Sequence, residues 1–284
     1  MRNLPDKPAA IFIDVDGTLR NDQREISARN RAALRLANTH GIQTVICTGR
    51  PRGHALRLCR ELDSGNYCVI CNGAGVLDVK NDNLLYRRLT PPELTLKLYD
   101  YLRANLPGSE EIFWEFKCVD ADYTTEQNEA NADKNRILIT EPLDKFLHNH
   151  ETMQLVIVHR TNGELMLKAS QLIAESNFGL KILNQQKHMV DPSFPSIGVP
   201  YIDIGDESIS KGLGVREFCR IMNFAPENCI AIGDDLNDLP MFAACGFKVA
   251  MGNALPEVLA VADYVTLDNA HDGVADLIEK IVQR

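Results

Sequence analysis

Short apolar runs alternate with amphipathic helical patterns in both outer thirds of this chain, with Gly, Asn or Asp at or near the end of each run. Runs of this length are typical of strands buried on both faces of a parallel sheet. They cover residues 9–13, 42–47, 67–71, 229–232, 247–251 and 264–267. The repeated order of strand and helix predicts an α/β fold with a doubly wound, Rossmann-like parallel sheet.

Helix boundary signals support the same organisation. Ser27 is placed to cap a helix that ends before Gly41, and Ser210 is placed to cap a later one. A further helix is expected after Asn237, and another carries Pro256 in its first turn. The two outer thirds therefore predict one sheet with helices between its strands.

The middle of the chain has a different pattern. Helical periodicity at residues 91–108 is followed by a strand pattern at 111–119 and a polar stretch at 127–134. Strand, helix and strand patterns then follow at residues 153–160, 162–177 and 179–184, before a Pro-rich stretch at 191–200. This order predicts an inserted α+β domain at residues 89–204, within a core made of residues 1–88 and 205–284.

Composition excludes several classes of protein. With 284 residues, 45% of them hydrophobic, the chain can bury a sizeable core. The net charge is -9, and no run of basic residues is longer than the pair Arg87 and Arg88, which disfavours a nucleic-acid or anionic-membrane partner. No segment approaches the roughly 20 apolar residues of a membrane span. A cytoplasmic monomer or weak homodimer is expected.

Eight cysteines are present, and two of them form a CxxC motif at Cys68 and Cys71. A zinc or redox site would need both thiols on one side of a turn. Residues 67–71 have the pattern of an extended buried strand, in which residues three apart face opposite ways. The sequence therefore favours buried, unreactive thiols.

Two acidic residues lie at the end of the first predicted strand. Asp14 and Asp16 stand two residues apart, on one side of an extended chain, at the edge where α/β sheets bind ligands. Gly17 lets the backbone turn immediately afterwards. Two carboxylates this close repel each other unless a cation neutralises them or one is protonated, and either case suits catalysis. The alternative is a solvated Asp-Gly turn.

A second acidic segment, GDDLND, follows the strand at residues 229–232. Asp234 and Asp238 stand four apart at the start of a helical pattern, so both can face one cation beside Asp14. Hard oxygen ligands of this kind indicate Mg²⁺ rather than Zn²⁺. The sequence therefore predicts a magnesium site built from two strand ends.

Candidate anion-binding groups occur twice. Thr48 can donate its hydroxyl, and its neighbours Gly49 and Arg50 can offer backbone N–H groups, near the start of a helix. Arg50 could contact a substrate or lie in a solvated turn. Lys211 opens a late helix, where the positive helix N-terminus repels a cation, so a nearby anion would explain it. The segment GDESISKG around Lys211 does not match a nucleotide P-loop, and no dinucleotide-binding GxGxxG motif follows the first predicted strand.

These residues resemble the four motifs of the haloacid dehalogenase superfamily. The motifs are DVDGTL at residues 14–19, Thr48, Lys211, and GDDLND at residues 233–238. The stretches CNGAGVLD, VAMGNALPEV and HDGVADLIEKI resemble the Cof-type phosphatases, in which an αββ-type (class IIB) cap lies between the second and third motifs. Departures are the second acid, Asp235, and the Pro-rich stretch in the middle domain.

The resemblance implies roles for individual residues. Asp14 would be the nucleophile that forms an aspartyl phosphate, and Asp16 the general acid and base. Thr48 and Lys211 would hold phosphoryl oxygens, with Asn237 near the phosphate.

The resemblance also implies a magnesium site. Mg²⁺ would be held by Asp14, by the backbone carbonyl of Asp16 and by Asp234, with Asp238 close by. The expected activity is a phosphatase acting on small phosphate monoesters. A phosphosugar mutase of the same fold and a non-catalytic phospholigand-binding protein remain alternatives, and the sequence does not distinguish sugar phosphates from pyridoxal phosphate or flavin mononucleotide.

Aromatic and histidine residues of the middle domain are expected to be structural. Trp114 is interpreted as a strand residue that packs in the core of the middle domain. No partner at metal-ligand spacing accompanies the histidines His148, His150, His159 and His188.

Overall fold

A computed structural model describes residues 3–62, 65–126, 136–185 and 199–283. The chain forms two compact units, one of Met1–Arg87 with Ser210–Arg284 and the other of Arg88–Ile209. The chain therefore leaves the first unit at Arg88, and it returns a few residues after the position 205 expected from the sequence.

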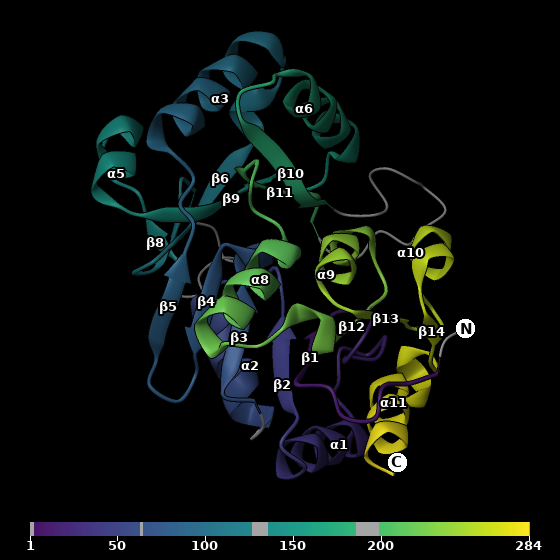
Figure 1. Cartoon of the computed structure of the whole chain (residues 1–284). Helices are drawn as coiled ribbons and strands as arrows, with labels where there is room; N and C mark the ends of the chain where they lie inside the picture. The colour runs from purple at the N-terminus through teal and green to yellow at the C-terminus, as the bar shows by residue number, and fades with distance from the viewer. Residues whose placement is uncertain (1–2, 63–64, 127–135, 186–198, 284) are drawn as a thin grey trace. The chain divides into compact units, whose positions relative to one another are not determined.

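The first unit contains an eight-stranded sheet in the order β14-β13-β12-β1-β2-β3-β4-β5 (Figure 1). Its strands are β1 (Ala10–Asp14), β2 (Gln43–Cys47), β3 (Tyr67–Ile70), β4 (Gly75–Asp78), β5 (Asn83–Arg87), β12 (Cys229–Gly233), β13 (Phe247–Ala250) and β14 (Tyr264–Val265). Pairing is parallel from β14 to β3, which confirms the predicted sheet. The strands β4 and β5 add an antiparallel edge that the sequence did not predict. The half-exposed β5 lacks the apolar run that marked the other strands.

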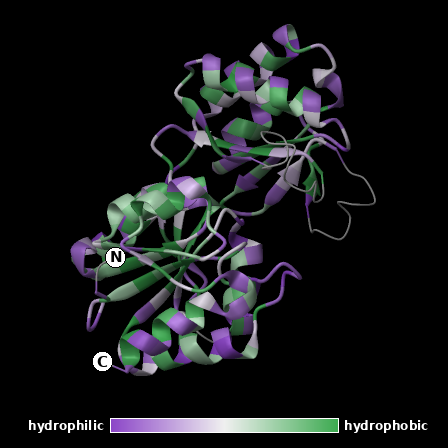
Figure 2. Ribbon diagram, turned by 90° about the vertical axis from the view of Figure 1, so that its right-hand side faces the viewer, coloured by the Kyte–Doolittle hydropathy of each residue, from purple (hydrophilic) through white to green (hydrophobic). Residues whose placement is uncertain are grey.

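Helices lie on both faces of this sheet (Figure 2). They are α1 (Ala28–Thr39), α2 (Arg52–Leu62), α8 (Lys211–Met222), α9 (Leu239–Ala244), α10 (Pro256–Val261) and α11 (Gly273–Val282), with single turns η1 (Cys71–Gly73), η3 (Pro226–Asn228), η4 (Leu236–Asp238) and η5 (Asn269–His271). The predicted caps are confirmed, because Ser27 accepts a hydrogen bond from the Asn30 N–H and Ser210 accepts one from the Leu213 N–H. Helix α1 packs against α11, and α8 packs against α9.

The central strand β1 is buried along its whole length, which fixes the position of the acid at its end. Ile11, Phe12 and Ile13 are fully buried, and the ring of Phe12 meets Phe218 of α8 edge to face, with 5.4 Å between ring centres. Burial of each such side chain contributes about 1.5–3 kcal/mol. Because β1 pairs with both β2 and β12, the carboxyl ends of three strands meet at Asp14.

The CxxC motif differs in detail from the sequence prediction. Strand β3 ends at Ile70, and Cys71 begins the turn η1 with φ 48°, so the two cysteines do not share one strand. All eight cysteines are nevertheless buried and free, which confirms that they are structural thiols.

The second unit contains a six-stranded sheet in the order β10-β11-β9-β6-β7-β8. Its elements are α3 (Pro92–Asn105), η2 (Ser109–Glu111), β6 (Phe113–Cys118), β7 (Asp122–Thr124), β8 (Ile137–Leu138), α5 (Leu143–Asn149), β9 (Thr152–Val158), α6 (Gly163–Glu175), β10 (Leu180–Gln185) and β11 (Tyr201–Asp206). Pairing is antiparallel except between β7 and β8. This confirms the predicted α+β character of the middle of the chain.

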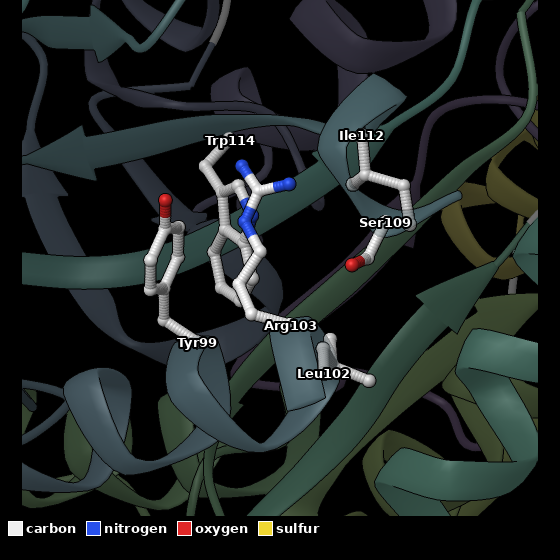
Figure 3. A pocket seen from close by; sticks show the side chains of 6 residues that line it. All are labelled: Tyr99, Leu102, Arg103, Ser109, Ile112 and Trp114. Carbon is white, nitrogen blue, oxygen red and sulfur yellow. The ribbon is translucent and has the colours of Figure 1, made fainter. Parts of the chain in front are cut away.

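Alternate residues of the second sheet pack against the helices α3, α5 and α6. Trp114 and Phe116 lie in this core, as expected, whereas Phe113 belongs to a small apolar cluster of its own with Val156 and Val158. A shallow surface depression lies beside Trp114 (Figure 3). It is lined by Tyr99, Leu102, Arg103, Ser109, Ile112 and Trp114, none of which is acidic. It contains none of the predicted site residues.

Within the described part of the chain, no helix is both long and apolar enough to cross a membrane. The histidines of the second unit make local contacts: His148 with a backbone carbonyl, His150 with Asp120 and His159 with Glu111. His188, the predicted polar stretch and most of the Pro-rich stretch lie outside the described residues.

Candidate active site

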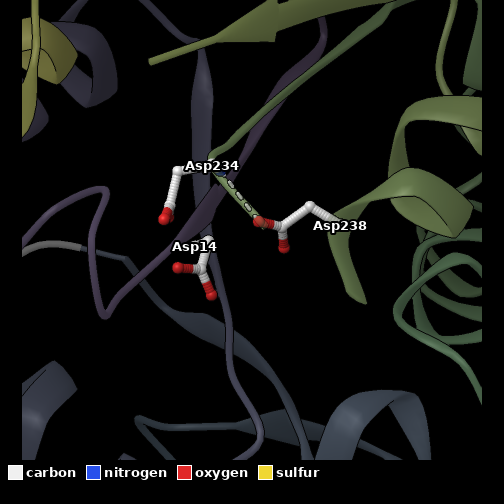
Figure 4. A group of neighbouring side chains, drawn as sticks. All are labelled: Asp14, Asp234 and Asp238. Carbon is white, nitrogen blue, oxygen red and sulfur yellow. Dashed lines mark hydrogen bonds between the residues drawn. The ribbon is translucent and has the colours of Figure 1, made fainter. Parts of the chain in front are cut away.

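Three carboxylates from two segments of the first unit converge at the end of strand β1 (Figure 4). Asp14 is the last residue of β1, Asp234 follows β12, and Asp238 ends the turn η4. One oxygen from each lies within 4.8 Å of the others, and all three residues are buried. The structure therefore brings together the acids that the sequence placed around one cation.

Lys211 lies inside the same cluster. Its Nζ donates to Asp14 Oδ1 and to Asp238 Oδ1, at 2.5 Å in each case, and its side chain is 1% exposed. These two carboxylates explain how a lysine can occupy the first turn of α8, where the helix dipole alone would repel its charge.

The charges of this cluster do not balance. Three carboxylates and one ammonium group leave a formal excess of two negative charges in a buried place. Burial, together with the charges of Asp238 and Asp234, raises the pKa of Asp14 well above its usual range, although Lys211 opposes the shift. Burial by itself lowers the pKa of Lys211, but the charges of Asp14 and Asp238 outweigh burial and hold that pKa above its usual range. The lysine stays charged, and the remaining negative charge calls for a cation.

Two of the three acids of the GDDLND segment, Asp234 and Asp238, are held differently. Both oxygens of Asp238 are used within the protein, since Oδ1 accepts from Lys211 and Oδ2 accepts from the backbone N–H groups of Asp234 and Asp235. The Oδ1 atom of Asp234 accepts from the Thr18 hydroxyl at 2.8 Å. Asp238 is therefore fixed as a support for Lys211 and for the loop. The second acid, Asp235, caps the turn η4.

Gly17 is required by close packing beside the cluster. Its φ is 91°, and a Cβ atom there would lie 2.4 Å from Asp234 Oδ2. A side chain at this position would displace the carboxylate, so the tight turn after Asp16 is part of the site.

The carboxylate of Asp16 is not a member of the buried cluster. Its side chain is 56% exposed, and Arg50 binds it in a bidentate manner, with Nη2 at 2.7 Å from Oδ1 and 2.9 Å from Oδ2. Arg20 Nη1 lies 3.9 Å away. Arg50 therefore neutralises Asp16. The sequence alone left two roles open for Arg50, a contact with the substrate or a place in a solvated turn.

Thr48, the predicted phosphate contact after β2, is 2% exposed. Its hydroxyl oxygen accepts from the Arg50 N–H at 3.2 Å, which leaves the hydroxyl proton available to a ligand. Asn237 donates to Asn72 Oδ1 over 3.5 Å, and the Asn72 carboxamide also packs against Gly49.

Sequence reasoning missed three residues that support the site. Thr18 binds Asp234, Asn72 lies between Gly49 and Asn237, and Asn253 donates to the Gly17 carbonyl at 2.8 Å. Each lies inside a stretch that carries the family resemblance, but the sequence pattern does not indicate what the residue contacts.

Comparisons with known proteins place the chain in a family. The model of the haloacid dehalogenase-like hydrolase family matches residues 11–278 of the chain. The curated protein Phosphatase YwpJ of Bacillus subtilis is 27% identical over 295 residues, which cover 96% of this chain and 99% of that protein.

A second curated relative from the same bacterium is 5-amino-6-(5-phospho-D-ribitylamino)uracil phosphatase YcsE. It is 28% identical, and the match covers 94% of this chain and 93% of that protein. The crystal structure of a haloacid dehalogenase-like hydrolase from Bacteroides thetaiotaomicron has a TM-score of 0.76 and 27% identity, and the match covers 97% of this chain and 100% of that one. The chain therefore belongs to the haloacid dehalogenase-like hydrolases, in their Cof-type phosphatase branch.

Proposed function

We propose that this chain hydrolyses small phosphate monoesters with the help of Mg²⁺ and through an aspartyl phosphate formed on Asp14. The observation that carries the proposal is the buried cluster of Asp14, Asp234, Asp238 and Lys211, whose net negative charge suits a divalent cation. Alternatives with a Zn²⁺ centre fit poorly, since no thiolate or imidazole joins these carboxylates in the cluster found among the described residues.

Asp14 and Asp234 are the side chains proposed to hold Mg²⁺, together with the backbone carbonyl of Asp16. Asp238 would support the site without binding the metal directly, because its oxygens already bind Lys211 and the loop backbone. When bound, Mg²⁺ supplies positive charge that lowers the repulsion between Asp14 and an approaching phosphate.

The reaction follows from the chemistry of these side chains. A carboxylate oxygen of Asp14 attacks phosphorus while the bond to the ester oxygen breaks, and Asp16 gives a proton to the departing alcohol. Asp16 then takes a proton from water, which attacks the phosphorus of the aspartyl phosphate while the bond from phosphorus to the Asp14 oxygen breaks. Inorganic phosphate leaves and the Asp14 carboxylate is regenerated. Lys211, Thr48 and Asn237 donate to the phosphoryl oxygens throughout.

Arg50 is proposed to hold Asp16 in its working position. We expect Arg50→Ala to lower kcat by about 10- to 100-fold. A positioned general acid accelerates a reaction by about 10²- to 10⁴-fold, and misplacing Asp16 should remove only part of that acceleration. Arg52→Ala is the matched control, because Arg52 stands two residues later and binds Asp82 instead. Steady-state rates for both variants check this expectation, and equal rates for the two would contradict the proposed contact.

The second unit is proposed to be the cap that selects the substrate. One face of its sheet carries buried charge, with Lys117 Nζ 2.9 Å from Glu115 Oε2 and Arg136 Nη1 2.5 Å from Glu115 Oε1. Charged groups on the face away from the helices suit a polar, hydroxylated leaving group better than an apolar one. Sugar phosphates and related metabolites are therefore the substrates we favour.

A panel assay tests the proposal. Phosphate release would be measured from phosphosugars, pyridoxal phosphate, flavin mononucleotide and p-nitrophenyl phosphate, with Mg²⁺ and with EDTA. We expect release that EDTA abolishes and that is fastest with a hydroxylated leaving group. Isomerisation of a phosphosugar without release would instead identify a mutase, and binding without turnover would identify a phospholigand-binding protein.

A further inference from the structure

The turn η1, directly after strand β3, has an unusual backbone. Cys71, Asn72 and Gly73 are consecutive and have φ values of 48°, 53° and 101°. All three are buried. The left-handed conformation costs an ordinary residue about 1–2 kcal/mol, so a buried run persists only where its surroundings enforce it. Residues with such strained backbone conformations cluster at functional sites.

Backbone contacts of this turn reach two segments of the candidate active site. The Asn72 N–H donates to the Thr48 carbonyl, and the Cys71 N–H donates to the Arg50 carbonyl, both at 3.1 Å. On the other side, a Cβ atom at Gly73 would lie 1.8 Å from the carbonyl oxygen of Ser210, the residue that caps the helix of Lys211. Only glycine allows this approach, so the turn ties the Thr48 loop to the start of α8.

The side chain of Asn72 reaches a third segment. It is 2% exposed, and its Oδ1 accepts from Asn237 Nδ2 over 3.5 Å. Its Nδ2 would lie 2.9 Å from a Cβ atom placed on Gly49, so the carboxamide packs directly against the loop after Thr48. The Asn72 carboxamide therefore lies between two of the segments that are proposed to hold the phosphoryl group.

We propose that Asn72 is a positioning residue, which sets Asn237 and the Thr48 loop so that their donors meet one phosphoryl group. This inference rests on the proposed function. Asparagine suits the position because it tolerates the left-handed backbone and carries both an acceptor and a donor. Glycine would keep the backbone and lose both side-chain contacts.

The variant Asn72→Gly isolates the side chain. We expect kcat/KM for the best phosphate ester of the panel to fall by about 10- to 100-fold, mostly through kcat, since small misplacements of transition-state contacts have effects of this size. Affinity for inorganic phosphate with Mg²⁺, measured by calorimetry, should fall by about tenfold. Asn223→Gly is the matched control, because Asn223 also has a left-handed backbone, with φ 55°, but caps the far end of α8.

A double-mutant cycle with Asn237→Ala separates positioning from general stability. We expect Asn237→Ala to lower kcat strongly in the natural protein and only slightly once Asn72 is glycine. If the two effects multiply independently, or if Asn72→Gly behaves like Asn223→Gly, the inference is overturned while the phosphatase function stands.

Two further outcomes are informative. A natural protein that hydrolyses no ester, yet binds phosphate in a manner that depends on Asn72, would overturn the function and leave the inference standing. A protein that neither hydrolyses nor binds phosphate would overturn both. Should Asn72→Gly fail to fold, Asn72→Asp keeps the shape and replaces the donor by an acceptor, with the same loss of kcat expected.

Discussion

Replacing Asp14 by Asn should abolish phosphate release and, at the same time, raise the stability of the metal-free protein. The first effect follows from the chemistry, because an amide is a poor nucleophile towards phosphorus and cannot form the aspartyl phosphate. Loss of a nucleophile typically lowers kcat by about 10⁴-fold or more. The overall shape of the side chain is kept, so binding of the substrate should persist.

The second effect follows from the buried charge around Asp14. Burial raises the pKa of this carboxyl well above the value of 3.8 that it has when exposed, and Asp238 and Asp234 add to the shift. The folded protein therefore binds a proton here more tightly than the unfolded chain does. Stability gained from this proton is fully present below pH 3.8 and is lost as the pH rises towards the raised pKa. Asparagine is neutral at every pH, so its advantage over Asp14 should grow with pH.

Unfolding by urea in EDTA, measured from pH 4 to pH 8, checks this expectation. Asp78→Asn is the matched control, since Asn81 hydrogen bonds lower the pKa of that exposed carboxyl and the sign of its pH dependence is reversed. The stability advantage of the natural protein over Asp78→Asn should stay nearly constant over this range and shrink only as the pH falls to 3.8 and below. An Asp14→Asn protein with normal turnover would contradict the role of Asp14 as nucleophile, and one with lower stability at pH 8 in EDTA would contradict the excess negative charge of the cluster.

Replacing Lys211 by Met should have the largest cost in stability of any single change at the site. The lysine is 1% exposed and is the cation shared by Asp14 and Asp238. Its removal leaves like charges facing each other in a buried place, and loss of one partner from a buried ion pair costs about 3–5 kcal/mol. Turnover should fall by about 10³-fold or more, because a donor to the phosphoryl group is lost as well.

A second substitution distinguishes charge from packing. If the cost comes from unbalanced charge, Asp14→Asn introduced together with Lys211→Met should restore a large part of the stability measured in EDTA. Lys280→Met provides the control, since the half-exposed Lys280 pairs with Asp276, and loss of that pair should cost about 1 kcal/mol or less and leave turnover unchanged. No recovery in the double variant would indicate a packing effect.

The parts of the fold that the sequence predicted are those with strong periodic signals. The buried strands around β1 have uninterrupted apolar runs, and because parallel strand ends meet at one edge, Asp14, Asp234 and Asp238 could be placed together without a structure. The hairpin of β4 and β5 was missed because it is short and half exposed at its outer strand.

Other features depend on side-chain geometry that periodicity does not encode. The pairing of Arg50 with Asp16 joins residues 34 positions apart through a partly buried and an exposed side chain, and nothing in either local pattern selects it. The strand pattern at residues 67–71 wrongly includes Cys71, which begins the left-handed turn. The packing of Gly73 against Ser210 favours that backbone from outside the segment. Long-range packing therefore decided these details.

The place of β1 between β2 and β12 also has a consequence for synthesis of the protein on the ribosome. Its partner β12 begins at Cys229, so the apolar first strand has one unpaired side until just over four-fifths of the chain has been made. An unpaired apolar strand is prone to join a neighbouring chain. The nascent chain is therefore most vulnerable to aggregation while the middle unit is emerging, and it gains its complete central sheet only late in translation.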